Sequence, residues 1–549
     1  MKKVIALFMV ITLMFSFAAC SKDTKKEGTS QKDSPTVAPT QGEEAESEDQ
    51  GSSLPQGGTI VVGQSTEPIT LNPDGNPDSA NDIIMQNVFS RLLKISNSED
   101  IIPDLALTYD VSDDGFTYTF HLREGVKFHD GESFTSEDVK FTFDQIIAQG
   151  GRASGGLSNV TDISCPDDLT VVFTLKQVDA SFIYNIAYQG TYVLPKHVYE
   201  GKDWLGADAM QPPIGTGPFK FSKWDKGISV TLEKNPDYFL GPEVPYLDKV
   251  ILSYITDTNT AMQAFYNGEL DVLGIIPASS EYATLFANQD VVMDKVVYPS
   301  RFVIGYNMNK KPFDDVNVRK AVACAINSDE IIQKALKEVG QKATTYITPL
   351  YSWAVNSDPT GAVQSYDAAK AVQYLEAAGL TKDGNGNYLK VKIDTLNYAP
   401  FTDVIQVIRD ELAKVGIEVE INMMEYAAWD EKVNQQKDFE VCVTSEYQGP
   451  DAGNLASCVV TGQYNNCFGY SNAQVDDLMT QALALSTREE RAPLYQQVQE
   501  ILAADIPYVP FSEWLGYYPY WSYVQGRPSS ADVADKAGNA EFTYTYLDK

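Results

Sequence analysis

The chain has 549 residues and a formal net charge of −33. So large a negative charge disfavours nucleic acid and anionic lipid surfaces as partners, because like charges repel. Six cysteines without a CxxC pair are too few for a fold held together by disulfides. Only three histidines occur, and HExxH, GxSxG, Walker A and GxGxxG motifs are absent. The sequence therefore predicts no catalytic residues, no cofactor and no metal site.

The first 20 residues have the pattern of a secretory signal peptide. Two lysines precede an apolar run over residues 4–17, which is shorter than a membrane span of about 20 residues. Two alanines then lead into Cys20, and FAAC resembles the lipobox of bacterial lipoproteins, in which the cysteine is acylated. An ordinary signal peptide is the alternative. We expect an extracytoplasmic protein anchored to the cell membrane by a lipid on Cys20.

Residues 21–57 predict a flexible, disordered tether. They are rich in Ser, Thr, Gln, Pro, Glu and Lys and almost free of large apolar groups. Such a segment cannot bury enough apolar surface to offset the entropy of ordering it.

From Gly58 onward, strands alternate with amphipathic helices. GGTIVVGQ predicts a strand, and SANDIIMQNVFSRLL has apolar residues at helical spacing. Between the predicted strands TYTFHL and TVVFTL, the sequence predicts a helix that begins at SEDVKFTF. Ser136 is its expected N-cap. The later helix YDAAKAVQYLEAAGL has Ser365 as its expected N-cap.

The segments LKVKIDTL, FTDVIQVIRDELAKVG and IEVEINMM predict strand, helix and strand. Gly416 lies where the C-terminus of such a helix favours a left-handed residue. This order is typical of a parallel sheet, and hence of an α/β domain. Two more amphipathic helices follow, AQVDDLMTQALAL and REERAPLYQQVQEILA, and then the aromatic stretch PYVPFSEWLGYYPYWSYV.

Several blocks, in order along the chain, resemble the family-5 solute-binding proteins. The longest is PDLALTYDVSDDGFTYTFHLREGVKFHDGESFTSEDVKFTF, followed by GTGPFKFSKWDKGISVTLEKNPDYF, YNMNKKPFDDVNVRKAVACAIN, YDAAKAVQYLEAAGL, ELAKVGIEV and ADIPYVPF. The resemblance covers nearly everything from Gly58 to about Tyr518. The family includes peptide- and nickel-binding members.

The resemblance implies an α/β, periplasmic-binding-protein-like clamshell of the class II type, with two lobes and an additional inserted domain. Lobe 1 is expected to comprise residues 58–93, 213–301 and 506–549, the inserted domain residues 94–212, and lobe 2 residues 302–505. The ligand would lie between the lobes, and the membrane permease would recognise the closed form. Arg123, His129 and Asp130 in the longest block are expected to serve the inserted domain's structure, away from the ligand.

The function implied is that of a substrate-binding lipoprotein of an ABC importer, not an enzyme. It would act as a monomer that delivers a small solute to the ABC permease subunits, and an oligopeptide is the favoured solute. An oligosaccharide is the alternative within the family, because 31 tyrosines and 6 tryptophans suit stacking on sugars. Nickel is disfavoured because lobe 2 contains no histidine. An adhesin or signalling lipoprotein with the same fold is the alternative from another class.

The resemblance also implies the residues of the ligand site in lobe 2. Peptide binders of the family hold the ligand's ammonium group with a carboxylate in a loop that here reads SEYQGP, so Glu446 takes that role and Tyr447 follows it. A solvated loop acid is the alternative for Glu446. Tyr426 in EYAAWDEKV is expected to face the ligand, with Trp429 packed in the core.

Other predicted contacts depart from the family pattern. Asn397 and Tyr398 stand where peptide binders often have an arginine for the ligand carboxylate, which disfavours a strict dipeptide receptor. Gly274 and Ile275 follow the GELD turn, where oligopeptide binders have polar residues. Outside the cytoplasm, Cys458 and Cys467 are candidates for a disulfide, because they are close in sequence.

Overall fold

The computed structural model describes residues 54–73, 79–95, 100–188, 190–203, 208, 211–274, 282–526 and 541–549. Cys20, the signal peptide and most of the predicted tether lie outside these residues. None of the helices in the described part of the chain is long and apolar enough to cross a lipid bilayer.

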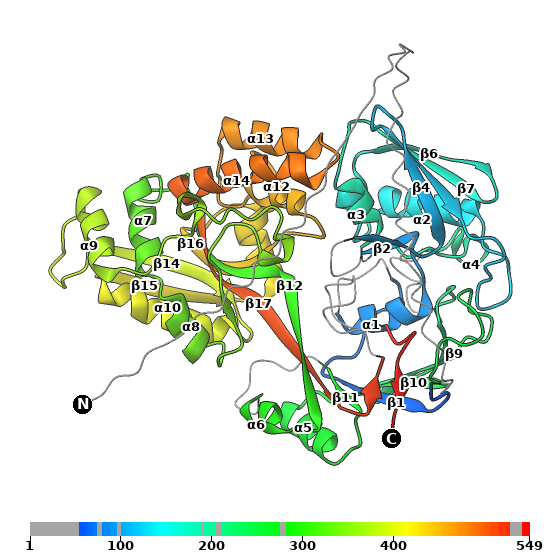
Figure 1. Ribbon diagram of the computed structural model, residues 1–549. Helices are drawn as coiled ribbons and strands as arrows, with labels where there is room; N and C mark the ends of the chain where they lie inside the picture. Colours follow the sequence, from blue (N-terminus) through cyan, green and yellow to red (C-terminus); the bar gives the residue numbers. More distant parts are fainter. Residues whose placement is uncertain are drawn as a thin grey trace, which may run out of the picture. The chain divides into compact units, whose positions relative to one another are not determined.

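An eleven-stranded mixed sheet runs through residues 54–549 (Figure 1). Its order is β15 (Ile417–Met424), β14 (Leu389–Leu396), β16 (Val441–Tyr447), β12 (Val291–Tyr306), β17 (Tyr508–Trp521), β11 (Val272–Leu273), β1 (Thr59–Gln64), β10 (Lys249–Tyr254), β9 (Ser229–Lys234) and β8 (Phe219–Asp225), with β13 (Gln341–Lys342) also paired to β17.

One hydrophobic core surrounds the β15–β14–β16 end of this sheet. The helices of this part are α7 (Val316–Ala325), α8 (Ser328–Lys334), α9 (Ala368–Ala377), α10 (Phe401–Lys414), α11 (Tyr426–Asp430), α12 (Ala456–Val459), α13 (Ala473–Leu483) and α14 (Arg488–Asp505). β14 pairs in parallel with both β15 and β16, and α10 connects β14 to β15. The predicted strand–helix–strand unit is therefore confirmed, and Gly416 has the expected positive φ of 81°.

A second core lies around a separate four-stranded sheet and the β1–β10–β9–β8 end of the large sheet. The four-stranded sheet has the order β4 (Ala106–Val111), β5 (Thr117–Leu122), β7 (Thr170–Leu175) and β6 (Val160–Asp167). The remaining elements here are α1 (Ser79–Val88), β2 (Leu93–Ile95), β3 (Ile101–Pro103), α2 (Ser136–Gln149), α3 (Phe182–Ile186), α4 (Lys196–Tyr199), β18 (Val524–Gln525) and β19 (Tyr546–Leu547). A small third core includes buried residues of α5 (Thr258–Tyr266) and α6 (Tyr282–Ala287).

Two long antiparallel strands, β12 and β17, connect the cores (Figure 1). Phe302 and Phe511 pack in the first core, whereas Val291 and Tyr520 pack in the other two. The first core at one end of these strands and the other two cores at the other end make the fold two-lobed. The assignment of segments to lobes and to an inserted domain stays a prediction.

Two predicted helix caps are wrong. Thr135, not Ser136, precedes α2, and its backbone N–H donates to the Asp138 carboxylate at 2.9 Å. The Ser136 hydroxyl donates instead to the Asp167 carbonyl at 2.6 Å. Asp367, not Ser365, caps α9 by accepting a hydrogen bond from the Lys370 N–H at 3.0 Å. A cap depends on which side chain reaches the free N–H groups of the first turn, and neighbouring polar residues compete for that role.

Gly215 and Gly217 allow their segment to lie directly against the end of α1. The Gly217 N–H donates to the Val88 carbonyl at 2.9 Å. A Cβ atom on Gly215 would lie 2.1 Å from that same carbonyl oxygen, so only glycine fits there. This contact fixes α1, which carries one of the residues of the cavity described next.

Candidate functional site

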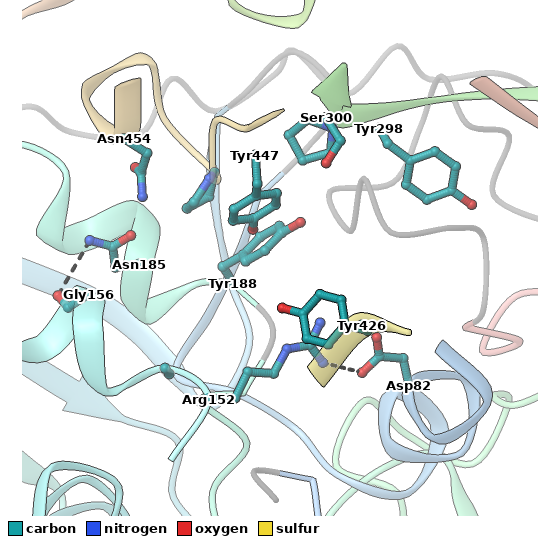
Figure 2. Close-up of a pocket in the computed structure, with 13 residues that line it drawn as sticks. Asp82, Arg152, Gly156, Asn185, Tyr188, Tyr298, Ser300, Tyr426, Tyr447 and Asn454 are labelled. Carbon is teal, nitrogen blue, oxygen red and sulfur yellow. Dashed lines mark hydrogen bonds and ion pairs between the residues drawn. The ribbon is translucent and has the colours of Figure 1, made fainter. Parts of the chain in front are cut away.

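A cavity of about 600 Å³ lies between the two lobes (Figure 2). Its walls come from five parts of the chain: α1, the segment after α2, the region around α3, residues 298–300 of β12, and the turns that follow β15 and β16. The lining residues include Asp82, Arg152, Asn185, Tyr188, Tyr298, Ser300, Tyr426, Tyr447 and Asn454. This volume lies within the range of about 300–1,000 Å³ that is typical of small-molecule sites.

On the β16 side, the wall presents two open aromatic rings. Tyr426 begins α11 and is 60% exposed, and Tyr447 ends β16 and is 45% exposed. Both rings also line a second cavity of about 210 Å³, which therefore adjoins the first. A tyrosine offers an apolar face for stacking and a hydroxyl for hydrogen bonding, so this wall suits a ligand with mixed chemistry.

The facing wall carries an ion pair. Arg152 Nη1 lies 2.6 Å from Asp82 Oδ1, and the two side chains are 21% and 9% exposed. Nearby, the Asn185 amide donates to the Gly156 carbonyl at 3.4 Å. Among the described lining residues of the large cavity, Asp82 and Arg152 are the ones that carry charge.

The strands that join the lobes are irregular where they meet the cavity. The pairing of β12 with β17 is regular up to Val297 and resumes at Arg301 with a shifted register. Tyr298, Pro299 and Ser300 lie in this interruption and line the cavity. Proline has no N–H to donate to a neighbouring strand, which favours a break at this point. The connection between the lobes is therefore least regular beside the cavity.

Directly after the break, three buried charged residues stand side by side on three strands. Arg301 on β12 pairs in register with Glu446 on β16 and with Glu513 on β17. All three side chains are at most 4% exposed. Arg301 donates hydrogen bonds to Glu513 and, at 2.8 Å, to the Thr345 carbonyl. Two carboxyl groups thus surround one guanidinium.

Glu446 lines the smaller cavity and keeps one oxygen without a partner. Its Oε1 accepts hydrogen bonds from the Tyr508 hydroxyl at 2.6 Å and from the Gln448 amide at 3.1 Å. Its Oε2 is buried with no hydrogen-bond partner among the described residues. Burial raises the pKa of Glu446, and Glu513 adds to the rise, while Arg301, Tyr508 and Gln448 oppose it. Glu446 is therefore a buried acid, and the alternative of a solvated loop acid does not fit the structure.

The other predicted site residues are not all brought together. Tyr447 and Tyr426 line both cavities, and Tyr398 lines the smaller one. Asn397 lines neither cavity and donates to Glu425 at 3.1 Å. Gly274 also lies away from both, where its N–H donates to the Gly63 carbonyl at 2.8 Å. Ile275 lies outside the described residues.

The predicted Cys458–Cys467 disulfide is not present, since both cysteines are buried free thiols. The sulfur of Cys458 lies 3.8 Å from the Tyr447 carbonyl oxygen. Cys467 instead interacts with the thiol of Cys442 on β16. The short separation of Cys458 and Cys467 in the sequence did not determine the directions in which their side chains point.

Three residues of the long family block make contacts remote from both cavities. The Arg123 side chain donates to the Asp104 carbonyl, and Asp130 contacts His197 at 2.8 Å. His129 contacts the Gly217 carbonyl at 3.0 Å, and burial lowers the pKa of His129 to about 4. In the described part of the chain, no group of three or more His, Cys, Asp or Glu residues is arranged to hold a metal ion.

Sequence reasoning missed the ion pair on the facing wall. Asp82 and Arg152 lie 70 residues apart in the sequence, and neither belongs to a motif. Tyr188, Asn185 and Tyr298 were missed for the same reason.

Comparison with known proteins identifies the family. Residues 100–465 match the model of the bacterial extracellular solute-binding proteins, family 5 (middle region). The chain belongs to this family.

Two relatives and one solved structure illustrate the similarity. The oligopeptide-binding protein AppA of Bacillus subtilis is 31% identical over 84% of this chain and 87% of its own length. The di/tripeptide-binding protein 1 of Pseudomonas aeruginosa is 30% identical over 80% of this chain and 85% of its own length. The structure of DppA from Helicobacter pylori, an ABC transporter-associated periplasmic binding protein in complex with the peptide STSA, aligns with a TM-score of 0.75 and 28% identity. That alignment covers 90% of this chain and 99% of DppA.

The family assignment and the two-lobed α/β fold predicted from the sequence are therefore confirmed. The chain is an extracytoplasmic solute-binding protein and not an enzyme.

The raised pKa of Glu446 predicts a pH-dependent cost to stability. A carboxyl whose pKa is higher in the folded state than its ordinary value of 4.5 binds its proton more tightly when folded. The free energy of unfolding should therefore fall as the pH rises from 4.5 through the folded-state pKa, by about 1.4 kcal/mol per unit of pKa difference. The variant Glu446→Gln imitates the protonated form. It should match wild type near pH 4 and be more stable than wild type at pH 8.

Urea unfolding of both proteins at pH 4, 6 and 8 measures this difference. Glu420→Gln is the matched control, because Glu420 is on β15 of the same core and its side chain is 55% exposed. A stability difference between Glu446→Gln and wild type that does not change with pH would contradict the prediction.

Proposed function

We propose that the protein is the substrate-binding component of an ABC importer and captures an oligopeptide between its two lobes for delivery to the membrane permease. The main support for a peptide as the ligand is the environment of Glu446. This buried carboxylate has an unpartnered oxygen at a cavity wall. With Glu513 it outnumbers the positive charge of Arg301, so the site favours a ligand that brings a cation. The N-terminal ammonium of a peptide is such a group, and the named functions of AppA, DppA and the P. aeruginosa relative support this choice.

The remaining chemistry of the site suits a peptide backbone. Tyr426 and Tyr447 offer faces and hydroxyls beside Glu446, and Asn185 and Asn454 offer amides on the walls of the large cavity. An ammonium group that reaches Glu446 would make a charge-assisted hydrogen bond in a water-poor site, which is stronger than a neutral one. It would also favour the ionised form of the Glu446 carboxyl, which burial disfavours.

An oligosaccharide remains the second candidate, because the same open tyrosine rings can stack on sugars. The unpartnered acid separates the two candidates, since a neutral sugar brings no charge to compensate it.

A binding experiment with defined mixtures tests the proposal. The protein is incubated with peptides of two to nine residues and, separately, with oligosaccharides, and the bound molecules are identified by mass spectrometry after denaturation. We expect intact peptides and no cleavage products. For the tightest binder, calorimetry should show that Glu446→Gln loses about 2–5 kcal/mol, the cost of truncating one partner of a buried charge pair.

N-acetylation of that peptide should cost as much as the substitution, and the two losses should not add, because they report one contact. Glu420→Gln should bind like wild type. Retention of sugars alone, with a loss in Glu446→Gln near the ~0.5–1.5 kcal/mol of an ordinary hydrogen bond, would favour the second candidate. Recovery of cleaved peptide would contradict a pure binding role.

We also propose that a lipid on Cys20 anchors the protein to the membrane, a role that the FAAC sequence supports. In a bacterial host fed an alkyne fatty acid, wild type should become labelled and sediment with membranes. Cys20→Ser should carry no label and appear in the soluble fraction. Cys165→Ser is the control and should behave as wild type. Membrane retention of unlabelled Cys20→Ser would refute the anchor.

A further inference from the structure

The cavity wall that faces Tyr426 and Tyr447 carries a guanidinium. Arg152 follows α2 after a glycine with a left-handed backbone, Gly150 (φ 72°), which turns the chain out of the helix. The arginine side chain reaches the cavity and pairs there with Asp82 of α1 (Figure 2). Tyr188 and Tyr447 line the same cavity (Figure 2). Arg152 and the tyrosine that directly follows Glu446 therefore lie at one cavity.

A ligand carboxylate could exchange with the Asp82 carboxylate as the partner of Arg152. A guanidinium has five N–H donors in a planar fork, which matches a carboxylate. Asp82 compensates the charge of Arg152 in a largely buried place, where an uncompensated charge is costly. A ligand carboxylate has the same chemistry as the Asp82 side chain. It can therefore compete with Asp82 for the N–H donors of the guanidinium.

The two walls then differ in the charge that they favour. The β16 side has an excess of carboxyl groups around Arg301, and the facing side has Arg152. Tyr426 and Tyr447 lie between them, since both residues line the two cavities. A ligand that extends from one cavity to the other meets an acid at one end and a guanidinium at the other.

We propose that Arg152 binds a carboxylate of the ligand in competition with Asp82, so that the preferred ligands carry both an ammonium and a carboxylate group. This inference rests on the proposed peptide function and deepens it. Asn397 and Tyr398 supply no cation in the β16 lobe, and Arg152 supplies one from the other side of the cavity. Binding to both lobes at once would hold them together. The carboxylate comes either from the peptide's C-terminus or from an acidic side chain.

Competition within peptide mixtures tests the role of Arg152. The first mixture contains tripeptides and pentapeptides without acidic residues, each with a free and an amidated C-terminus in equal amounts. The second contains amidated peptides only, with Glu or Gln at each position in turn. Mass spectrometry of the retained peptides gives the ratio of carboxylate to amide forms. The first mixture reports a terminal carboxylate and the second a side-chain carboxylate.

Wild type should prefer the carboxylate form in at least one mixture by about 10-fold or more, as expected for a hydrogen bond to a charged group. Arg152→Gln should lower that ratio to about 1, and Arg152→Lys, which keeps the charge but loses the fork, should give an intermediate ratio. Asp82→Asn should keep or enlarge the preference, because it removes the competing charge. Arg409→Gln is the matched control, because the Arg409 side chain on α10 is 43% exposed, and it should leave the ratio unchanged. Thermal unfolding confirms that each variant is folded.

A wild-type ratio of about 1 in both mixtures would overturn the inference while leaving peptide binding intact. An unchanged preference in folded Arg152→Gln would also overturn it and leave the ion pair as a contact that merely joins α1 to the segment after α2. If wild type retains no peptide at all, the proposed function itself fails, and the inference fails with it.

Discussion

Arg301 is fully buried between two acids. It lies on β12 directly after residues 298–300, where the pairing with β17 is interrupted, and β12 enters the core of the β16 lobe there. A buried guanidinium must be compensated, and in this fold the neighbouring strands each bring a carboxyl group to the same register. Glu513 takes the direct hydrogen bond, so Glu446 is left with neutral donors and one bare oxygen. The strand that joins the lobes and the acid that faces the cavity therefore belong to one electrostatic unit. A change in the charge of Arg301 or of Glu446 should therefore alter the electrostatic environment of the other.

This arrangement explains why an acid is kept in so unfavourable a place. Burial alone penalises the charged form of Glu446, and its pKa rises accordingly. A ligand ammonium beside Glu446 would offset this penalty by pairing with the carboxylate. On the facing wall the buried charge of Arg152 is instead compensated by a neighbouring side chain, that of Asp82. The two walls are thus suited to ligand groups of opposite charge.

Local patterns in the sequence predicted the α/β character of the fold, whereas the two-lobed architecture was implied by the family resemblance. The β14–α10–β15 unit follows from the apolar spacing of its segments and from Gly416, whose left-handed backbone the structure confirms. The helix caps were misjudged, because more than one polar residue precedes each helix: Thr135 rather than Ser136 caps α2, and Asp367 rather than Ser365 caps α9. Tyr426, Tyr447 and Glu446 came from the family resemblance, and the structure brings them to one place. No local pattern could reveal Arg152 and Asp82, which meet only through the packing of α1 against the segment after α2.

The central claim is that a ligand held by both walls draws the lobes together at the irregular crossing of β12 and β17. Small-angle X-ray scattering of the wild-type protein, alone and saturated with the tightest-binding peptide, tests it most directly. The account predicts a smaller radius of gyration in the peptide complex, and little change when the same peptide is added at that concentration to folded Arg152→Gln. A radius of gyration that is unchanged while calorimetry shows the wild-type site to be filled would contradict it.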